Sequence, residues 1–160
     1  MILRYRELNG QSGHDAGWQL LEQTYREATG KDMPEILHTD RGKPYFADDT
    51  LHFSISHTPK HVFCALSGNN VGIDAEELDR KVNWNLAEKI LSPGEKAQFD
   101  AAGEKSRALL TFWVLKEAAA KLSGEGLRGY PSHTNFSLED SRVTEIADCL
   151  VAVLEEKGDQ

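Results

Sequence analysis

Three strand-length segments between residues 51 and 75 constrain the fold of this chain more than any other feature of its sequence. Residues 51–56 alternate apolar and polar side chains, residues 61–67 are almost continuously apolar, and residues 71–75 follow a Gly-Asn-Asn turn. Period-two alternation and short apolar runs bounded by turn residues are typical of β-strands joined by hairpins. The sequence therefore predicts an antiparallel meander of three strands.

The predicted meander would bring an imidazole and two carboxylates together. Its first and third strands run in the same direction, so their C-terminal ends lie at the same edge of the sheet. His57 ends the first strand, while Asp74 and Glu76 end the third. Side chains two residues apart point to the same face of a strand. We therefore expect His57, Asp74 and Glu76 to share one rim.

Helix signals occur on both sides of this meander. The apolar spacing within residues 14–29 predicts an amphipathic helix, which Gly30 would end. The segment Ser92-Pro93-Gly94-Glu95 has the form of a capping box with proline at the first helical position, so it predicts the start of a short helix. Strong helix formers over residues 104–122, followed by Gly124, predict a longer helix.

The remaining strand signals complete the expected fold. Further short strands are predicted at residues 1–8, 35–38, 134–138, 143–146 and 149–154. No internal repeat is visible in the sequence. We expect a single α+β domain over residues 1–160, in which an antiparallel sheet packs against helices.

Composition limits the classes of partner. The chain has 160 residues and a net charge of −8, which argues against general nucleic-acid binding. Residues 80–130, however, carry 9 basic against 6 acidic side chains, which would suit a polyanionic small ligand or a solvated helix face. No apolar run approaches the ~20 residues of a membrane span, and no signal peptide is recognisable. We expect a cytoplasmic protein whose two cysteines, Cys64 and Cys149, are buried and reduced.

The Asp74 and Glu76 pair has two interpretations. Acidic residues at a strand end are often part of a solvated turn. Here they directly follow the apolar residues 71–73, which would hold them rigidly. Two carboxylates on one face repel each other unless a cation or a proton intervenes. Mg²⁺ fits this role, because it binds one or two carboxylates together with phosphate oxygens and water.

A second candidate group lies on the longer predicted helix. Trp113, Glu117 and Lys121 are four residues apart and therefore share one face. Glu117 and Lys121 could be an exposed pair worth only ~0.3–0.5 kcal/mol. The large aromatic side chain on the same stripe favours the floor of a binding site instead. The histidines at positions 52, 57 and 61 match no common zinc spacing, so zinc is not expected.

Four segments together resemble a known enzyme family. They are Gly42-Lys43-Pro44, Ser56-His57, the strand from Gly72 through Asp74 to Glu76, and the helix from Trp113 through Lys116 and Glu117 to Lys121. In order and approximate spacing they are similar to the signature of the surfactin-type 4′-phosphopantetheinyl transferases. The resemblance covers about residues 42–126. It implies the fold of that family, and it leaves open whether the halves of this chain are related by the pseudo-twofold of the larger members.

The resemblance implies a reaction and roles for individual residues. The family transfers 4′-phosphopantetheine from coenzyme A to a serine of an acyl or peptidyl carrier protein and releases 3′,5′-ADP. It implies that Asp74, Glu76 and Glu117 hold Mg²⁺ and that Glu117, Lys121 and Asp74 are catalytic, with Glu117 the first candidate for the base. Coenzyme A would contact Gly42, Lys43, Pro44, Ser56, His57, Lys116 and Lys121.

The sequence leaves two features without an assigned role. Family members hold the 3′-phosphate with basic residues in their N-terminal portion, whereas only Arg4 and Arg6 precede the first predicted helix here, and neither can be assigned that role. An apolar patch at Leu127 and Tyr130 could contact the carrier or belong to the core.

The competing functions are an inactive module that binds coenzyme A or a nucleotide, and a metal-dependent phosphohydrolase. No membrane or nucleic-acid partner is expected.

Overall fold

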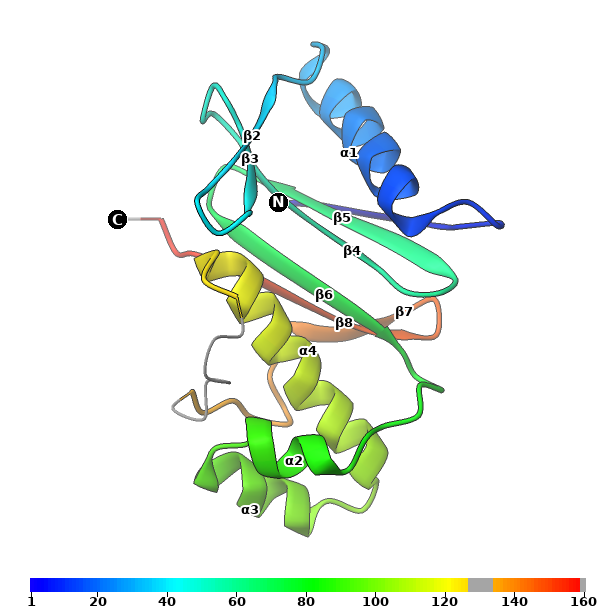
Figure 1. Ribbon diagram of the computed structural model, residues 1–160, viewed down its shortest axis with the longest axis vertical. Helices are drawn as coiled ribbons and strands as arrows, with labels where there is room; N and C mark the ends of the chain where they lie inside the picture. Colours follow the sequence, from blue (N-terminus) through cyan, green and yellow to red (C-terminus); the bar gives the residue numbers. More distant parts are fainter. Residues whose placement is uncertain (127–133, 159–160) are drawn as a thin grey trace.

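The computed structural model of the protein describes residues 1–126 and 134–158 and has two three-stranded antiparallel sheets (Figure 1). The first sheet has the order β1-β5-β4 and the second the order β6-β8-β7, while β2 and β3 form a separate hairpin. In chain order the elements are β1 (Ile2–Glu7), α1 (Gly13–Thr29), β2 (Ile36–His38), β3 (Pro44–Phe46), β4 (His52–His57), β5 (His61–Ser67), β6 (Val71–Glu77), α2 (Asn85–Ile90), α3 (Pro93–Ala101), α4 (Lys105–Ser123), β7 (Val143–Ile146) and β8 (Cys149–Glu155).

The predicted three-stranded meander is wrong in its pairing. β4 and β5 form the expected antiparallel hairpin, but β6 pairs with β8 over its whole length instead of with β5. Both edges of β5 are already occupied, because β1 pairs with one edge and β4 with the other. A strand has only two edges at which it can form a backbone ladder, so β6 must find its partner elsewhere.

β6 nevertheless lies directly beside β4, and side chains join the two strands (Figure 1). The N–H of Ile73 donates to the Ser54 hydroxyl and the N–H of Ala75 donates to the Ser56 hydroxyl, each over 3.1 Å. Both bonds link residues 19 apart in sequence, so the two strands run in the same direction. We call this serine-mediated contact the seam. The C-terminal ends of β4 and β6 therefore do lie at one edge, although the strand order is not the predicted one.

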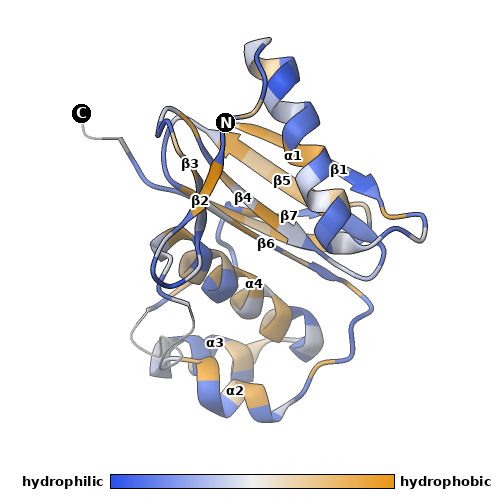
Figure 2. Ribbon diagram, turned by 45° about the horizontal axis from the view of Figure 1, so that its top comes forward, coloured by the Kyte–Doolittle hydropathy of each residue, from blue (hydrophilic) through white to orange (hydrophobic). Residues whose placement is uncertain are grey.

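Each half of the molecule repeats one order of elements. A first strand (β1 or β6) is followed by a helix that packs on the sheet (α1 or α4) and later by a hairpin whose last strand (β5 or β8) inserts beside the first. Figure 2 shows the apolar residues concentrated on the central strands, whereas much of α1 is hydrophilic. The fold is α+β, as predicted, and a pseudo-twofold relation between the halves stays a prediction.

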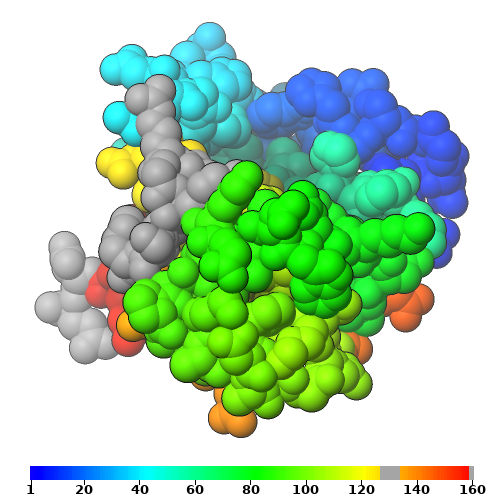
Figure 3. Space-filling model, turned by 60° about the horizontal axis from the view of Figure 1, so that its bottom comes forward, coloured from blue at the N-terminus to red at the C-terminus, as the bar shows by residue number. Residues whose placement is uncertain are grey.

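The additional helices α2 and α3 form a layer beneath α4. In Figure 3 the green residues of this layer cover the end of the molecule away from α1 and the β2–β3 hairpin. The capping box at the start of α3 is confirmed, because the Ser92 hydroxyl accepts from the Glu95 N–H and the Glu95 carboxylate accepts from the Ser92 N–H. The helices over residues 14–29 and 104–122 are confirmed within a residue at each end.

The strand predicted at residues 134–138 does not form. The Phe136 N–H donates to a Glu95 oxygen and the Leu138 N–H donates to the Gln98 side chain, so α3 takes the bonds that a strand partner would need. Strand β3, at residues 44–46, was not among the predicted strands. Leu127 and Tyr130 of the predicted apolar patch lie outside the described residues. Among the helices described here, none has the length and apolarity needed to cross a membrane.

Gly72 allows α4 to approach β6 closely. A Cβ at this position would lie 2.2 Å from the Ala118 carbonyl oxygen and 2.6 Å from the Leu122 nitrogen, and both are backbone atoms of α4. Gly72→Ala should therefore lower the free energy of unfolding by about 1–3 kcal/mol or more, as other overpacked sites do. Chemical denaturation of both proteins measures the change.

Gly68→Ala is the matched control, because a Cβ at Gly68 meets no atom within 4 Å. It should leave the free energy of unfolding within about 0.5 kcal/mol of the wild type. Equal effects of the two substitutions would contradict the close packing of α4 on β6.

Candidate active site

A cleft of about 420 Å³ lies between the start of α1, the β2–β3 turn, β4 and the C-terminal half of α4. The apolar part of its wall includes Trp18, Phe53 and Ile55. Most of the polar side chains that line it are lysine, arginine or histidine, namely His14, Arg41, Lys43, His57 and Lys121. Among the described residues that line the cleft, Glu117 is the acidic one. Such a lining suits a ligand that combines an apolar portion with several negative charges.

Asp74 is a buried carboxylate with an unsatisfied oxygen. Its Oδ1 accepts hydrogen bonds from the Ser56 hydroxyl at 3.3 Å and from the Lys121 ammonium at 3.4 Å, but none of the residues that the structure describes donates to Oδ2. Burial raises the pKa of Asp74 to about 7; the neighbouring Lys121 opposes this rise, whereas Glu76 and Glu117 add to it. A buried, unpaired carboxylate oxygen beside further carboxylates is a suitable ligand for a hard cation.

Glu76 and Glu117 complete the predicted acidic group. Glu76 Oε1 accepts from Arg80 and from the Trp113 indole N–H, the latter at 3.1 Å. Burial raises the pKa of Glu117, with a further rise from Glu76, whereas Lys121 and Arg80 act in the opposite direction. The three carboxylates therefore interact electrostatically with one another.

The acidic group is more open than a closed metal site. Within the described residues, the one set of three potential ligands whose atoms all lie within 4.8 Å of one another is found elsewhere, at His61, Glu77 and Cys149. Three carboxylates repel each other, and here Lys121 and Arg80 partly neutralise them. The donor set and the orphaned Asp74 oxygen fit Mg²⁺, which often keeps several waters and few protein ligands.

Lys121 links this acidic group to the cleft. Its ammonium donates to Asp74 Oδ1 and, at 3.2 Å, to the Ile55 carbonyl, and its side chain remains 34% exposed and lines the cleft. Glu117 lies one turn earlier on the same face of α4 and lines the same cleft. The pairing of these two residues with the strand carboxylates could not be read from the helix pattern alone.

The glycine-lysine-proline turn and His57 lie where the sequence places them. Gly42, Lys43, Pro44 and His57 all line the cleft. The Lys43 ammonium donates to the Asn70 side chain at 2.6 Å and to the Leu122 carbonyl at 2.8 Å. Burial lowers the pKa of Lys43, so this cation is already partly desolvated and tied to the end of α4.

Lys116 and Ser56 do not line the cleft, which differs from the expectation that both contact coenzyme A. The Lys116 side chain is 1% exposed and pairs with the fully buried Glu95 at 2.7 Å. Neighbouring helix residues are about 100° apart, so Lys116 faces α3 while Glu117 faces the cleft. The Ser56 hydroxyl is buried in the seam, where it binds Ala75 and Asp74.

The residues that line the cleft without having been predicted for the site include Arg41, His14 and Trp18. Arg41 precedes the glycine-lysine-proline turn, and its place beside that motif is the signal that could have identified it. His14 and Trp18 come from the first two turns of α1. The apolar spacing of residues 14–29 places Trp18 on the buried face of the predicted helix. Only the packing of α1 across β4 and β5 brings His14 and Trp18 to the cleft.

Comparison with known proteins assigns the chain to a family. Residues 70–150, half of the chain, match the model of the 4′-phosphopantetheinyl transferase superfamily. The chain therefore belongs to this superfamily, and it carries the predicted α+β fold and both acidic segments of the resemblance.

Curated relatives support the same assignment. The 4′-phosphopantetheinyl transferase AcpT of Escherichia coli O157:H7 is 36% identical over 97 residues, which cover 58% of this chain and 50% of that protein. The transferase gsp of Aneurinibacillus migulanus is 34% identical over 88 residues, or 54% of this chain and 36% of that protein. The transferase psf-1 of Bacillus pumilus is 31% identical over 134 residues, or 80% and 57%. The chain thus matches about a third to somewhat over half of the length of these relatives.

The raised pKa of Asp74 predicts an unusual pH dependence of stability. The unfolded carboxyl ionises near its ordinary pKa, whereas the folded one holds its proton up to about 7. The unfolded state therefore loses this proton at a lower pH than the folded state, and the free energy of unfolding falls as the pH rises between these two values. Asp74→Asn should be more stable than the wild type by an amount that grows by the order of 2 kcal/mol from about pH 5 to about pH 8 without divalent metal.

Asp140→Asn is a control of opposite sign, because hydrogen bonds from Arg142 lower the pKa of Asp140. That substitution should destabilise the protein by a similar amount at both pH values, because Asp140 is ionised in the folded and in the unfolded state throughout this range. Denaturation at both pH values measures the two effects. If the effect of Asp74→Asn did not depend on pH, the pKa of Asp74 would not be raised by the fold.

Proposed function

We propose that this protein transfers 4′-phosphopantetheine from coenzyme A to a serine of an acyl or peptidyl carrier protein, with Mg²⁺ as cofactor and 3′,5′-ADP as product. The observation that carries this proposal is the contact of Lys121 with Asp74. It joins a cleft lined by cationic and imidazole side chains to a group of three carboxylates. Membership of the superfamily and the transferase relatives support the same reaction.

In this proposal Asp74, Glu76 and Glu117 hold the metal. When bound, Mg²⁺ would neutralise charge on the pyrophosphate of coenzyme A. Lys121 orients the same phosphates, because its ammonium lies at the boundary between the cleft and the carboxylates. Phosphoryl transfer depends mainly on positioning and electrostatic stabilisation, which these side chains can provide.

Glu117 is the proposed general base for the carrier serine. It lines the cleft, and burial raises its pKa towards the range in which a carboxylate accepts a proton efficiently. In this role Glu117 takes the proton of the serine hydroxyl as the oxygen attacks the β-phosphorus of coenzyme A, and the pyrophosphate bond breaks to release 3′,5′-ADP.

The remainder of the cleft is proposed to hold the nucleotide. The turn at Gly42 to Pro44 lies beside it, and Trp18 offers an apolar surface at the other wall. Arg41, Lys43 and His57 are the proposed partners of the 3′-phosphate. Arg4 and Arg6, by contrast, do not line the cleft; Arg6 bonds to Gln11 and Gln19 instead. Lys116 is left out of the proposed site because of its buried pair with Glu95.

A cytoplasmic location is part of the same proposal. Cys64 and Cys149 are both buried and free, as predicted, which agrees with a reducing compartment. Membrane and nucleic-acid partners are not proposed, given the net charge of −8.

The test is incubation of the full chain with coenzyme A, Mg²⁺ and purified acyl and peptidyl carrier proteins, followed by mass analysis. A carrier should gain the mass of one phosphopantetheine, and 3′,5′-ADP should appear only when that carrier is present. Lys121→Ala should lower the transfer efficiency by about ten- to a hundredfold, the value of one charge-assisted contact. Lys89 is an exposed lysine of α2 away from the cleft, so Lys89→Ala should leave the transfer efficiency unchanged.

The competing functions give different results in the same assay. A phosphohydrolase would cleave coenzyme A without a carrier, and an inactive binding module would release no product while still binding coenzyme A. Either result contradicts the proposed transfer, as does equal activity of Lys121→Ala and Lys89→Ala.

The assignment of Arg41 predicts its effect on donor choice. Arg41→Ala should reduce the preference for coenzyme A over 3′-dephospho-coenzyme A by about ten- to a hundredfold, because one charge-assisted hydrogen bond is lost. Arg4→Ala is the control, since Arg4 lies on β1 outside the cleft. Calorimetric titration with both ligands measures the preference. An unchanged ratio for Arg41→Ala would remove Arg41 from the 3′-phosphate site.

A further inference from the structure

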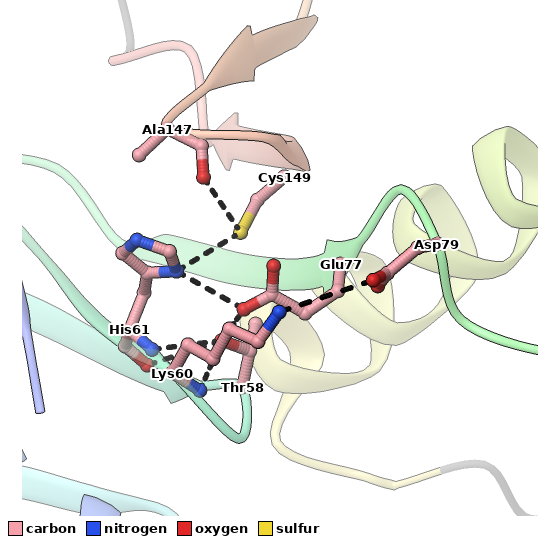
Figure 4. Close-up of polar contacts among 7 residues, drawn as sticks. All are labelled: Thr58, Lys60, His61, Glu77, Asp79, Ala147 and Cys149. Atoms are coloured by element: carbon pink, nitrogen blue, oxygen red, sulfur yellow. Dashed lines mark hydrogen bonds and ion pairs between the residues drawn. The ribbon is translucent and has the colours of Figure 1, made fainter.

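A second group of potential metal ligands lies on the other face of β6 (Figure 4). It consists of His61 at the start of β5, Glu77 at the end of β6 and Cys149 at the start of β8. One ligand atom from each residue lies within 4.8 Å of the other two, and all three residues are buried. The group therefore brings an imidazole nitrogen, a carboxylate oxygen and a sulfur into one small volume.

The strand register explains why these residues meet. Glu77 and Cys149 are direct partners in the β6–β8 ladder, so their side chains project from the same face. The period of two along β6 turns Glu77 away from Glu76 and Asp74, which belong to the candidate active site. His61 comes from β5 of the other sheet, which contacts β6. The group thus spans the two sheets.

Hydrogen bonds already join these side chains, and they bring together atoms that could also bind a metal ion. His61 Nδ1 lies 3.0 Å from Glu77 Oε1 and 3.7 Å from Cys149 Sγ, as the dashed lines in Figure 4 show. A ring nitrogen carries at most one proton, so it can make one good bond to these two neighbours. The sulfur also lies 3.6 Å from the Ala147 carbonyl and interacts with Glu77. A cation between the three atoms would satisfy all of them at once.

We propose that His61, Glu77 and Cys149 form a binding site for a divalent transition-metal ion, with Zn²⁺ as the best fit. Zinc binds nitrogen, sulfur and carboxylate oxygen at about 2.0–2.3 Å, so its ligand atoms stand roughly 3–4 Å apart, close to the separations in this group. A thiolate and a carboxylate would balance the charge of the ion. Thiolate and imidazole ligands disfavour Mg²⁺, so this site differs in its metal from the acidic group on the opposite face.

The surroundings of the site are compatible with an ion. The Thr58 hydroxyl donates to Glu77 Oε1 over 2.5 Å and so fixes the orientation of this ligand, as supporting hydrogen bonds do at metal sites. The nearby charges of Lys60 and Asp79 pair with each other at 3.9 Å. His61 also borders a surface pocket of about 340 Å³, which brings solvent close to the group. A water molecule can therefore fill the fourth position.

The proposed ion would have a structural role that does not depend on the proposed transferase activity. It would tie the ends of β5, β6 and β8 together and so connect the two sheets at the end away from Gly72. Binding to the folded state alone raises stability by mass action.

The experiment is a titration of the tag-free, metal-free full chain with Co²⁺, followed by displacement with Zn²⁺. One equivalent of Co²⁺ should produce the near-ultraviolet charge-transfer absorption of a thiolate–cobalt bond, and Zn²⁺ but not Mg²⁺ should abolish it. Cys149→Ser should lose this absorption. Cys64→Ser, which changes the other buried cysteine, should keep it.

Glu77→Gln provides a second variant that retains the sulfur. It should keep the absorption but weaken the Co²⁺ affinity by roughly tenfold or more, and Zn²⁺ should raise the melting temperature of the wild type more than that of this variant. Absence of the absorption in the wild type would overturn the proposal. So would its survival in Cys149→Ser, its loss in Cys64→Ser, or equal affinities of Glu77→Gln and the wild type.

Discussion

The seam between β4 and β6 is the contact on which the arrangement of the molecule depends. Two serine hydroxyls accept the backbone N–H groups of Ile73 and Ala75 and thereby replace a backbone ladder. They fix both the direction and the register of β6 relative to β4. The same Ser56 hydroxyl also donates to Asp74. One pair of side chains therefore joins the sheets and positions the most buried carboxylate of the candidate active site.

Helix α4 uses neighbouring residues for different purposes. Lys116 is buried in an ion pair with Glu95 that connects α4 to α3, where removal of one partner would leave an uncompensated charge. Glu117 and Lys121 face the cleft and meet the carboxylates of β6. The rotation of about 100° between successive helix residues separates the structural lysine from the functional pair. Close approach of α4 to β6 requires the missing side chain of Gly72.

Strand β6 has a comparable division between its two faces. On one face Asp74 and Glu76 belong to the acidic group beside the cleft, whereas on the other face Glu77 points to His61 and Cys149. The proposed magnesium and transition-metal sites would thus lie on opposite faces of one strand. Their ligands differ in kind, with oxygen alone on one face and nitrogen, sulfur and oxygen on the other, and this difference would let each face select its own ion.

The sequence by itself determined the local structure and the family. The capping box at Ser92 and Glu95 and the glycines after α1 and α4 act through hydrogen bonds and backbone conformations within a few residues, so their signals are complete in the sequence. The motif residues from Gly42 to Lys121 likewise indicated the superfamily that the comparison confirmed.

Only the tertiary structure decided which strands pair and which side chains reach the cleft. The partner of β6 is β8, more than 70 residues later, and Arg41 and Trp18 reach the cleft from elements distant from α4 in sequence. The helix pattern placed Lys116 and Lys121 on different faces, but it did not show which face packs against α3 and which meets the cleft. Side-chain burial and the pairing of distant strands depend on which surfaces meet when the whole chain packs. The local sequence does not specify them, because several strands could pair with the same edge before the chain has folded.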